Sequence, residues 1–262
     1  MDPALAAQIS EAVAEKVLQY RRDKSGWKIC REGVSEELGG KGSRGLCCLG
    51  PASLKPPGSS SPRCFLHSNL RSWVEEAIPL GVVSLKSIGR GVHTMTPGGN
   101  LYRGEGVVNG TPEKVWDCIK PVAGSLREQW DENVSRFEII QSITDTLCIT
   151  RTATPSAAMK LISPRDFVDV ALVKKYEDGT ISSNATNVEH PLCPPKPGYV
   201  RGFNHPCGCF CEPVPGEPNK TNLVTFFQTD LSGYLPQSVV DSFFPRSMAG
   251  FYSNLQKAVR KF

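Results

Sequence analysis

The stretch Ile162-Ser163-Pro164-Arg165-Asp166-Phe167-Val168 leads into residues 167–176, a run rich in β-branched and other apolar residues that is typical of a strand. The dipeptide Asp178-Gly179 follows this run and favours a tight hairpin turn. Residues 180–188, after the turn, are again strand-like. An antiparallel pair of strands is therefore predicted to begin at this stretch.

Further strand-like runs lie on both sides of this pair. They cover residues 101–108, 137–142, 146–152, 199–203, 207–211 and 223–229. A short helix is expected after the first run, because Thr111 is a suitable N-cap and Pro112 suits the first turn. A second short helix is expected over residues 122–130. The middle of the chain thus predicts an antiparallel sheet with two small helices inserted.

A long helix is predicted at each end of this pattern. A helix is predicted over residues 2–22, because Asp2 can cap its start and apolar residues recur every four positions. Residues 236–262 carry one apolar helical face, and Pro245 should kink this helix or split off its first turn. That face consists of Val240, Phe244, Met248, Phe251, Leu255 and Val259. A curved sheet that grips the last helix covers both apolar surfaces, which makes the expected fold α+β.

The charge balance excludes one class of partner. The chain has 30 Lys and Arg residues against 26 Asp and Glu, a net charge of +4. This is too little to neutralise the phosphates along a nucleic acid, so no nucleic-acid partner is expected. The first residues lack the pattern of a secretory signal, and no run approaches the ~18 apolar residues of a membrane span. The ten cysteines are therefore expected to be reduced thiols in the cytosol, with transient visits to intracellular membranes.

Residues 162–168 form one of three sequence motifs that together point to a known family. The others are Asn100-Leu101-Tyr102-Arg103-Gly104-Glu105-Gly106 and Asp230-Leu231-Ser232-Gly233-Tyr234-Leu235-Pro236. Together they resemble the START (StAR-related lipid transfer) domain family, and the short chain is similar to the small single-domain members of its sterol group. The resemblance covers residues 1–33 and 99–262. It implies a helix-grip fold with an interior lipid tunnel, a C-terminal helix that acts as a lid, and lipid transport without enzymatic turnover.

Residues 34–98 interrupt this resemblance. Gly, Ser and Pro make up 26 of the 65 residues in the span, a composition with little reason to pack. We expect a disordered insertion that displaces the first hairpin of the family and weakens lipid binding. The alternative is that residues 73–78 and 80–85 form a replacement helix or strand.

The ligand is expected to carry several hydroxyl groups. Cholesterol-carrying members of the family are known for an acid–arginine pair in the tunnel, and Thr152 and Ala171 stand at those positions here. A pocket of hydroxyls with one carboxyl suits a bile acid or an oxysterol at least as well as cholesterol. The expected tunnel lining, chosen by strand alternation and the last helix, is Cys148, Thr150, Thr152, Phe167, Asp169, Ala171, Phe227, Val240, Phe244 and Met248. The Pro-rich loop 191–198 is expected at the tunnel mouth, with gating residues Pro194, Pro195 and Pro197.

Plainer alternatives exist for these assignments. Thr150 and Thr152 suit any strand because they are β-branched. Asp169 has an alternative place in water or beside a Lys, since an unpaired buried carboxylate is costly. Arg165 is expected to form a structural salt bridge rather than a ligand contact. Two aromatic side chains are expected in the core: Tyr234 and Phe244.

Other chemistry has little support in the sequence. The segment His205-Pro206-Cys207-Gly208-Cys209-Phe210-Cys211, with His190 and Cys193, suggests zinc, but alternate cysteines simply share one face of a strand. No metal site is expected, and without a nucleophile elbow or a nucleotide-binding glycine loop no catalytic residue or cofactor is expected. Two alternatives remain open: a hydrolase or cyclase acting in the same tunnel, and an interaction protein without a ligand. The working expectation is a monomer whose partners are a sterol or bile-acid ligand and, transiently, membrane surfaces.

Overall fold

The computed structural model describes residues 1–25, 27–32, 84–88 and 100–262. The helices in these ranges are α1 (Pro3–Arg22), α2 (Pro112–Ile119), α3 (Arg127–Trp130) and α4 (Gln237–Lys261). The strands are β1 (Lys28–Glu32), β2 (Ser84–Ile88), β3 (Leu101–Asn109), β4 (Arg136–Ser142), β5 (Leu147–Ala153), β6 (Arg165–Lys175), β7 (Ile181–Asn187), β8 (Val200–Arg201), β9 (Phe203–Asn204), β10 (Cys207–Val214), β11 (Glu217–Phe227) and β12 (Thr229–Asp230).

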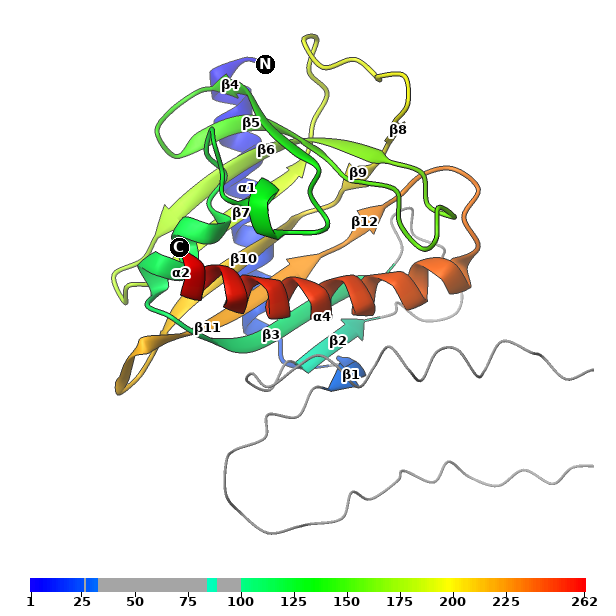
Figure 1. Ribbon diagram of the computed structural model, residues 1–262. Coiled ribbons are helices and arrows are strands. Elements are labelled where there is room, and N and C mark those ends of the chain that lie inside the picture. The colour runs from blue at the N-terminus through cyan, green and yellow to red at the C-terminus, as the bar shows by residue number, and fades with distance from the viewer. Residues whose placement is uncertain (26, 33–83, 89–99) are drawn as a thin grey trace, which may run out of the picture.

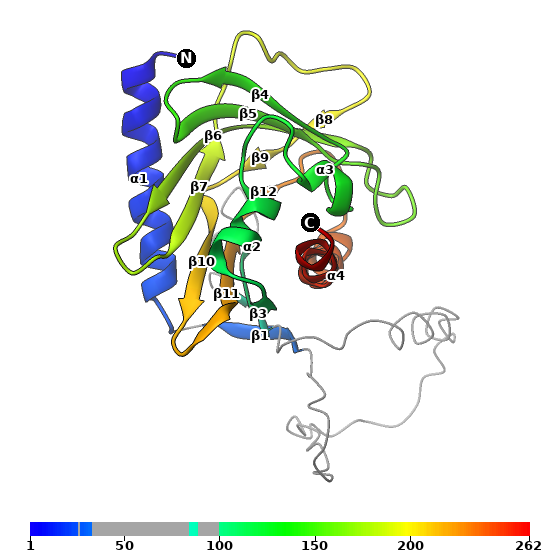
Figure 2. The ribbon, with the colours of Figure 1, turned by 60° about the vertical axis from the view of Figure 1, so that its left-hand side comes forward.

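Most of the strands form one curved sheet. Its order is β1-β2-β3-β11-β10-β7-β6-β5-β4, and every neighbouring pair along this path is antiparallel. The short strand β8 pairs with the start of β6 in parallel orientation, and β9 pairs with β12. Figure 2 shows the sheet curving between α1 on its outer side and α4 on its inner side. The expected α+β arrangement, a curved antiparallel sheet around the last helix, is confirmed.

Helix α1 covers the outer face of the sheet (Figure 1). Asp2 caps the helix, because its carboxylate accepts a hydrogen bond from the backbone N–H of Leu5 at 2.9 Å. The buried side of α1, which includes Ala6, packs against Val168 and Val170 of β6. The even-numbered residues of β6 therefore face outward. Because side chains alternate along a strand, the odd-numbered residues face inward, toward α4.

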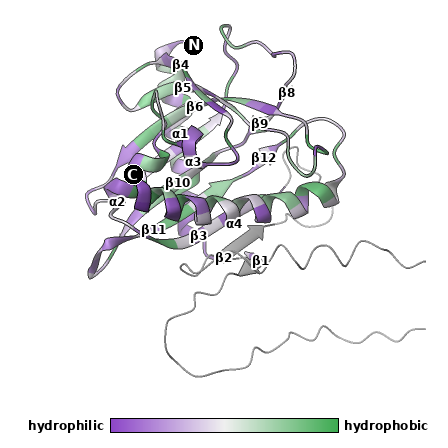
Figure 3. Ribbon diagram, in the orientation of Figure 1, coloured by the Kyte–Doolittle hydropathy of each residue, from purple (hydrophilic) through white to green (hydrophobic). Residues whose placement is uncertain are grey.

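Helix α4 runs along the inner side of the sheet, and Figure 3 shows hydrophobic and hydrophilic residues alternating along it. Its Leu255 packs in one cluster with Val115 of α2 and Leu223 of β11. Pro245 lies inside the helix, which continues from Gln237 to Lys261, so the expected split of its first turn is wrong. Proline has no N–H, so the helix lacks the hydrogen bond from residue 245 to the carbonyl of Asp241. Water can bind this carbonyl instead, because Asp241 is exposed. None of the helices in the described ranges is long and apolar enough to cross a membrane.

Some of the predicted elements differ from the observed ones. The strand expected over residues 223–229 is divided between β11, which begins earlier, and β12. The helix expected over residues 122–130 is shorter, since only α3 at its end is helical. The strand expected over residues 199–203 is divided into β8 and β9 at Gly202. A Cβ atom at Gly202 would collide with the ring of Phe167, so the chain makes a close approach there that only glycine permits.

Residues 84–88 lie inside the span 34–98 that the sequence assigns to an insertion. They form β2, which pairs with β1 on one side and with β3 on the other. The expectation of disorder is therefore wrong for these residues, because they continue the sheet. The expectation for residues 34–83 and 89–98 lies outside the described part of the chain.

The side chain of Arg165, at the start of β6, holds the segment that leads into α4. Its guanidinium donates to the carbonyls of Leu231 at 3.0 Å and Ser232 at 3.1 Å. A third hydrogen bond, of 2.6 Å, goes to the carbonyl of Ser163. Within the described residues its partners are thus backbone carbonyls and not the carboxylate that the sequence predicts. The buried guanidinium satisfies loop carbonyls that no strand or helix pairs.

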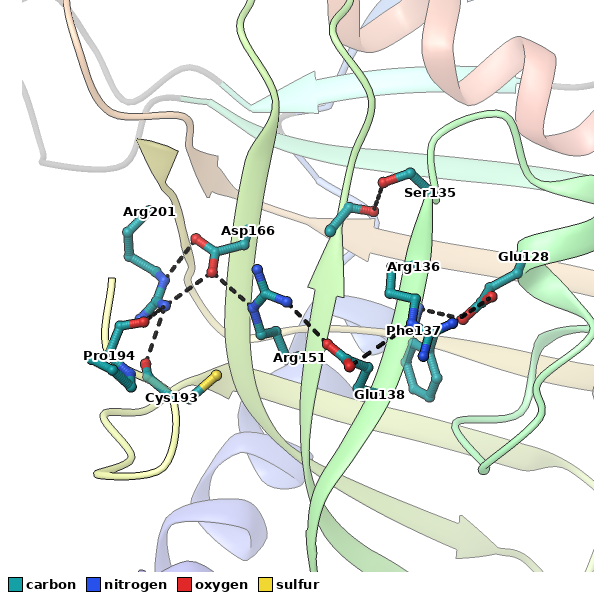
Figure 4. Close-up of polar contacts among 11 residues, drawn as sticks. Glu128, Ser135, Arg136, Phe137, Glu138, Arg151, Asp166, Cys193, Pro194 and Arg201 are labelled. Atoms are coloured by element: carbon teal, nitrogen blue, oxygen red, sulfur yellow. Dashed lines mark hydrogen bonds and ion pairs between the residues drawn. The ribbon is translucent and has the colours of Figure 1, made fainter. Parts of the chain in front are cut away.

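The next residue, Asp166, joins two arginines on the outer side of β6 (Figure 4). Its fully buried carboxylate accepts from Nε of Arg151 and from Nε of Arg201, both at 2.9 Å. Burial opposes ionisation of Asp166, but the hydrogen bonds from Arg201 and Arg151 outweigh it and hold the pKa below its usual value. Arg201 also donates to the carbonyl of Cys193 at 3.2 Å, which ties the Pro-rich loop to the sheet.

We predict that Asp166→Asn destabilises the fold by about 3–5 kcal/mol, because it leaves the buried guanidinium of Arg151 and the partly buried one of Arg201 without their shared counter-charge. Urea unfolding followed by circular dichroism measures the change. The matched control is Asp145→Asn, since Asp145 is an exposed carboxyl in a turn and its change should lie within about 0.5 kcal/mol of wild type. Equal unfolding midpoints for both variants would contradict the role of the buried pair.

Candidate ligand-binding site

The inner face of β5 and β6 brings together the residues that alternation predicted. The antiparallel register sets them in three directly opposite pairs: Cys148 with Ala171, Thr150 with Asp169, and Thr152 with Phe167. Phe167 belongs to the same buried cluster as Phe244 of α4. The six residues therefore form one continuous surface that faces the last helix.

The neighbouring strands extend this inner face. On β7, Ala185 lies opposite Ala171 and Asn187 lies opposite Asp169. On β10, Cys207 lies opposite Ala185. Sequence reasoning missed Asn187, which is the directly opposed neighbour of the buried carboxyl.

Aromatic side chains close one end of the inner face. Phe227 of β11 stacks on Tyr102 at 5.1 Å between ring centroids, and Phe244 lies 5.2 Å from Phe227. Val240 packs against the same cluster. Met248 lies farther along α4, where its sulfur is 3.6 Å from the hydroxyl of Thr225. The predicted lining residues of β11 and α4 thus lie on the side of the sheet that carries Phe167.

The two aromatic residues expected in the core have different positions. Phe244 is buried, as predicted. Tyr234 is fully exposed, so that prediction is wrong. It lies between Gly233 and Leu235 in the loop before α4, where neither strand nor helix periodicity directs a side chain inward.

Two cysteines of the inner face are shielded from solvent. Burial raises the pKa of the thiols of Cys148 and Cys209 to about 11. Both residues are partly buried. The aromatic end and the polar middle of the inner face therefore lie on the side of the sheet that α4 covers.

Asp169 is the buried carboxyl of this face, and its side chain is only half satisfied. Its Oδ2 accepts a hydrogen bond from the amide of Asn204 at 2.8 Å, while its Oδ1 has no partner among the described residues. Burial raises its pKa to about 7, against the smaller lowering effects of Asn204 and Arg201. Asp169 therefore points neither to water nor to a lysine, which were the alternatives to a place on the inner face.

The two positions of the missing acid–arginine pair both lie on the inner face, but they are not directly opposite. Thr152 pairs with Phe167, and Ala171 lies four residues farther along β6. At ~3.3 Å per residue, the two Cα atoms are separated by about 13 Å along the strand. The polar group between these positions is Asp169, opposite Thr150.

The Pro-rich loop is anchored on the other side of the sheet. Cys193 is buried with Val168 and Val170 beneath α1, on the outer face. The side chains of three loop residues are exposed: Pro194, Pro195 and Pro197. The carbonyl of Pro194 also accepts from Arg201 at 3.3 Å. These contacts fix the start of the loop on the outer face, and a gating role stays a prediction.

The cysteines of β10 do not lie beside Cys193, one of the other suggested zinc ligands. Cys207, Cys209 and Cys211 alternate along β10, and Cys211 packs in the cluster that contains Leu255 of α4. Cys193 lies on the outer face instead. Over the described ranges, no three His, Cys, Asp or Glu side chains gather as metal ligands do.

A cavity of about 300 Å³ lies away from this face. It is lined by α2, the loop after it and the end of the chain, and includes Lys114, Asp117, Lys120 and Phe262. None of the predicted lining residues belongs to it.

Asn204 is a neighbour of Asp169 that the sequence did not reveal. Its amide oxygen accepts from the hydroxyl of Thr229 at 2.8 Å, which turns its N–H groups toward Asp169. Asn204 lies on β9, a strand of two residues, and reaches Asp169 only because the chain passes Phe167 at Gly202. No local pattern predicts such a contact.

The comparisons with known proteins agree with this geometry. A family profile described as START domain matches residues 67–262. StAR-related lipid transfer protein 5 of Mus musculus is 66% identical over 262 residues, covering 100% of this chain and 99% of the relative, and that of Homo sapiens is 64% identical with the same coverage. The solved structure of human StAR-related lipid transfer protein 5 superposes with a TM-score of 0.76 at 61% identity, covering 100% of this chain and 99% of the other. Human STARD10, at 20% identity and a TM-score of 0.55, covers 69% of this chain and 74% of its own and shares the fold.

We predict that Asp169 makes the fold less stable as the pH rises. Its folded pKa of about 7 lies above the ordinary value of 3.8, so its favourable contribution is complete below the unfolded pKa and is lost as the pH rises through 7. Between about pH 5 and about pH 8 the loss is on the order of 2–3 kcal/mol. Asp169→Asn should remove this loss, while Asp145→Asn should keep it.

Urea unfolding of wild type and both variants at the two pH values measures these differences. Parallel pH profiles for wild type and Asp169→Asn would show that the carboxyl does not titrate in this range.

Proposed function

The chain belongs to the START domain family, and on that premise we propose that it binds one sterol-like lipid reversibly between the sheet and α4 and carries it between membranes. The ligand class is a bile acid, an oxysterol or cholesterol. The family profile and the relatives named lipid transfer proteins support binding and transport of lipid. The observation that carries the proposal is the inner face of the sheet beneath α4, with its aromatic end and a few polar groups on β5 and β6.

A hydroxylated ligand fits this face best. The walls offer apolar contact through Phe167 and Phe227, which suits rings and alkyl chains. Polar groups are few and lie together: the hydroxyls of Thr150 and Thr152 and the carboxyl of Asp169. Thr152 and Ala171 stand at the positions of the charged acid–arginine pair, so those two positions offer the ligand a neutral surface.

We propose transport without chemical change. The buried carboxyl of Asp169 has an amide, that of Asn204, as its hydrogen-bond partner, and not a base or a nucleophile. An amide neither accepts a proton nor acts as a nucleophile, so this hydrogen bond suits positioning rather than proton transfer or acyl transfer.

The end of the molecule near the start of α4 is the proposed contact with membranes. Met159 and Leu161, in the loop between β5 and β6, are 94% and 63% exposed, and Tyr234 in the loop before α4 is fully exposed. The two loops meet in one cluster through Ile162 and Leu231. Apolar side chains held out from a folded core in this way favour insertion between lipid headgroups. We further propose a cytosolic monomer, in which the free thiols of the described cysteines stay reduced.

We predict saturable one-to-one binding of cholesterol, 25-hydroxycholesterol or cholate, measured by tryptophan fluorescence and NMR titration. Ala171→Trp should weaken binding at least about tenfold, because the indole fills space beside Asp169. The control Ala123→Trp adds the same ring to an exposed loop residue and should leave the affinity unchanged. If none of the three lipids gives a saturable signal, the proposed function is wrong.

We also predict that membrane contact and binding can be separated. The double variant Met159→Glu with Leu161→Glu should slow transfer of a sterol between vesicles by at least about tenfold without a change in affinity, because two apolar anchors are lost. The control is Leu192→Glu, which changes an equally prominent residue, 76% exposed, in the Pro-rich loop. Transfer rates that fall equally in the control would contradict the assignment of this end of the molecule.

A further inference from the structure

The ring of His190, just before the Pro-rich loop, uses both of its nitrogens in contacts of opposite direction. Nδ1 accepts a hydrogen bond from the backbone N–H of Leu192 at 3.2 Å. Nε2 lies 2.9 Å from Oε1 of Gln141 on β4. Because Nδ1 accepts and an amide oxygen cannot donate, Nε2 carries the proton and the ring is neutral. These contacts fit one tautomer of the neutral ring and do not fit the imidazolium.

The amide of Gln141 cannot turn over to relieve this arrangement, because Met1 holds both of its ends. Oε1 accepts from the amino group of Met1 at 2.9 Å, and Nε2 donates to the carbonyl of Met1 at 3.1 Å. Figure 2 shows the start of α1 close to β4. The amide oxygen is thus shared by one cation and one neutral imidazole. A protonated ring would place a second positive charge close to the first.

The groups around the ring oppose its protonation. His190 is 8% exposed, and burial together with the amino group of Met1 lowers its pKa below the ordinary value of 6.5. Cys193 is buried, and burial raises the pKa of its thiol, so it brings no charge. The carboxyls next to this cluster in the sequence are directed elsewhere, since Asp2 caps α1 and Glu189 is exposed.

The hydrogen bond to Nδ1 holds the first turn of the Pro-rich loop. On protonation Nδ1 becomes a donor and meets the N–H of Leu192, so this hydrogen bond is lost. Farther along the loop, the carbonyls of Cys193 and Pro194 accept from Arg201, which keeps its charge at any physiological pH. Protonation should therefore open the turn 190–192 and leave the anchor at Arg201 in place.

We propose that His190 is a pH-sensitive switch, which fastens the start of the Pro-rich loop to β4 when neutral and releases the turn 190–192 in mild acid. The switch lies on the outer side of the sheet, where Cys193 packs beneath α1. It is therefore separate from the inner face and does not depend on the identity of the lipid.

The direction of the pKa shift fixes the sign of the effect. The folded pKa of His190 lies below 6.5, so the folded state binds fewer protons than the unfolded state as the pH falls below that value. The contribution of His190 to stability is thus complete above the unfolded pKa and is lost toward acid. Asp169 has the opposite sign, because its raised pKa favours the fold in acid. A local measurement is therefore needed to observe the switch.

An NMR titration of the whole chain from about pH 8 to about pH 4.5 follows the His190 ring and the Leu192 amide together. Both should titrate with one midpoint below 6.5. Below that midpoint the backbone order parameter of Leu192 should fall from about 0.85 to less than about 0.6. The amide of Gly202 should stay rigid, because it donates to the carbonyl of Asp166 at 2.9 Å beside the anchor at Arg201.

Two variants separate the charge of the ring from its contact. In His190→Asn, the side-chain oxygen can accept the N–H two residues on as Nδ1 does, but it cannot be protonated. Leu192 should then stay ordered over the whole pH range. The control His205→Asn removes a half-buried histidine on another segment and should keep the wild-type response.

Each result decides for or against the switch. A Leu192 amide that stays rigid below the midpoint of the His190 titration overturns it, and so does one that loosens equally in His190→Asn. A His190 ring that does not titrate above about pH 4.5 also overturns it. If His190→Asn does not fold, the wild-type comparison of Leu192 with Gly202 is sufficient. Lipid binding at neutral pH, and with it the proposed function, stands or falls separately.

Discussion

Two adjacent side chains at the start of β6 hold the segments that enclose the site, and they work on opposite sides of the strand. Arg165 gathers the carbonyls of Leu231 and Ser232, so the loop that leads into α4 is held against the sheet. Asp166 forms ion pairs with Arg151 of β5 and Arg201 of β8, and thereby fixes the connection that follows β7. Because strand side chains alternate, one dipeptide can hold both loops without steric conflict.

The binding surface follows from this arrangement. Once the loop before α4 is held at β6, the first turns of the helix lie over Phe167, and Phe244 closes the aromatic end of the inner face. At the other end of α4, Leu255 and its neighbours pack tightly against α2 and β11. The polar groups of β5 and β6, among them Thr150 and Asp169, lie on the same face of the sheet.

The sequence could predict which residues share the inner face, because alternation is a local property of a strand and needs no knowledge of the fold. It could not predict register, so it did not show that Thr152 lies opposite Phe167 and well away from Ala171. Tyr234 was misassigned for a related reason, since hydrophobicity alone does not orient a loop residue. Asn204 was missed because its place depends on a contact between segments distant in the chain, which only tertiary structure creates.

The burial of Asp169 connects the packing of the inner face with the response of the fold to pH. The amide of Asn204 orients the carboxyl through Oδ2, while Oδ1 has no partner among the described residues. Burial raises the pKa of Asp169 to about 7, because a charged carboxylate is costly away from water. The folded state therefore favours the neutral carboxyl and loses stability as the pH rises through that value.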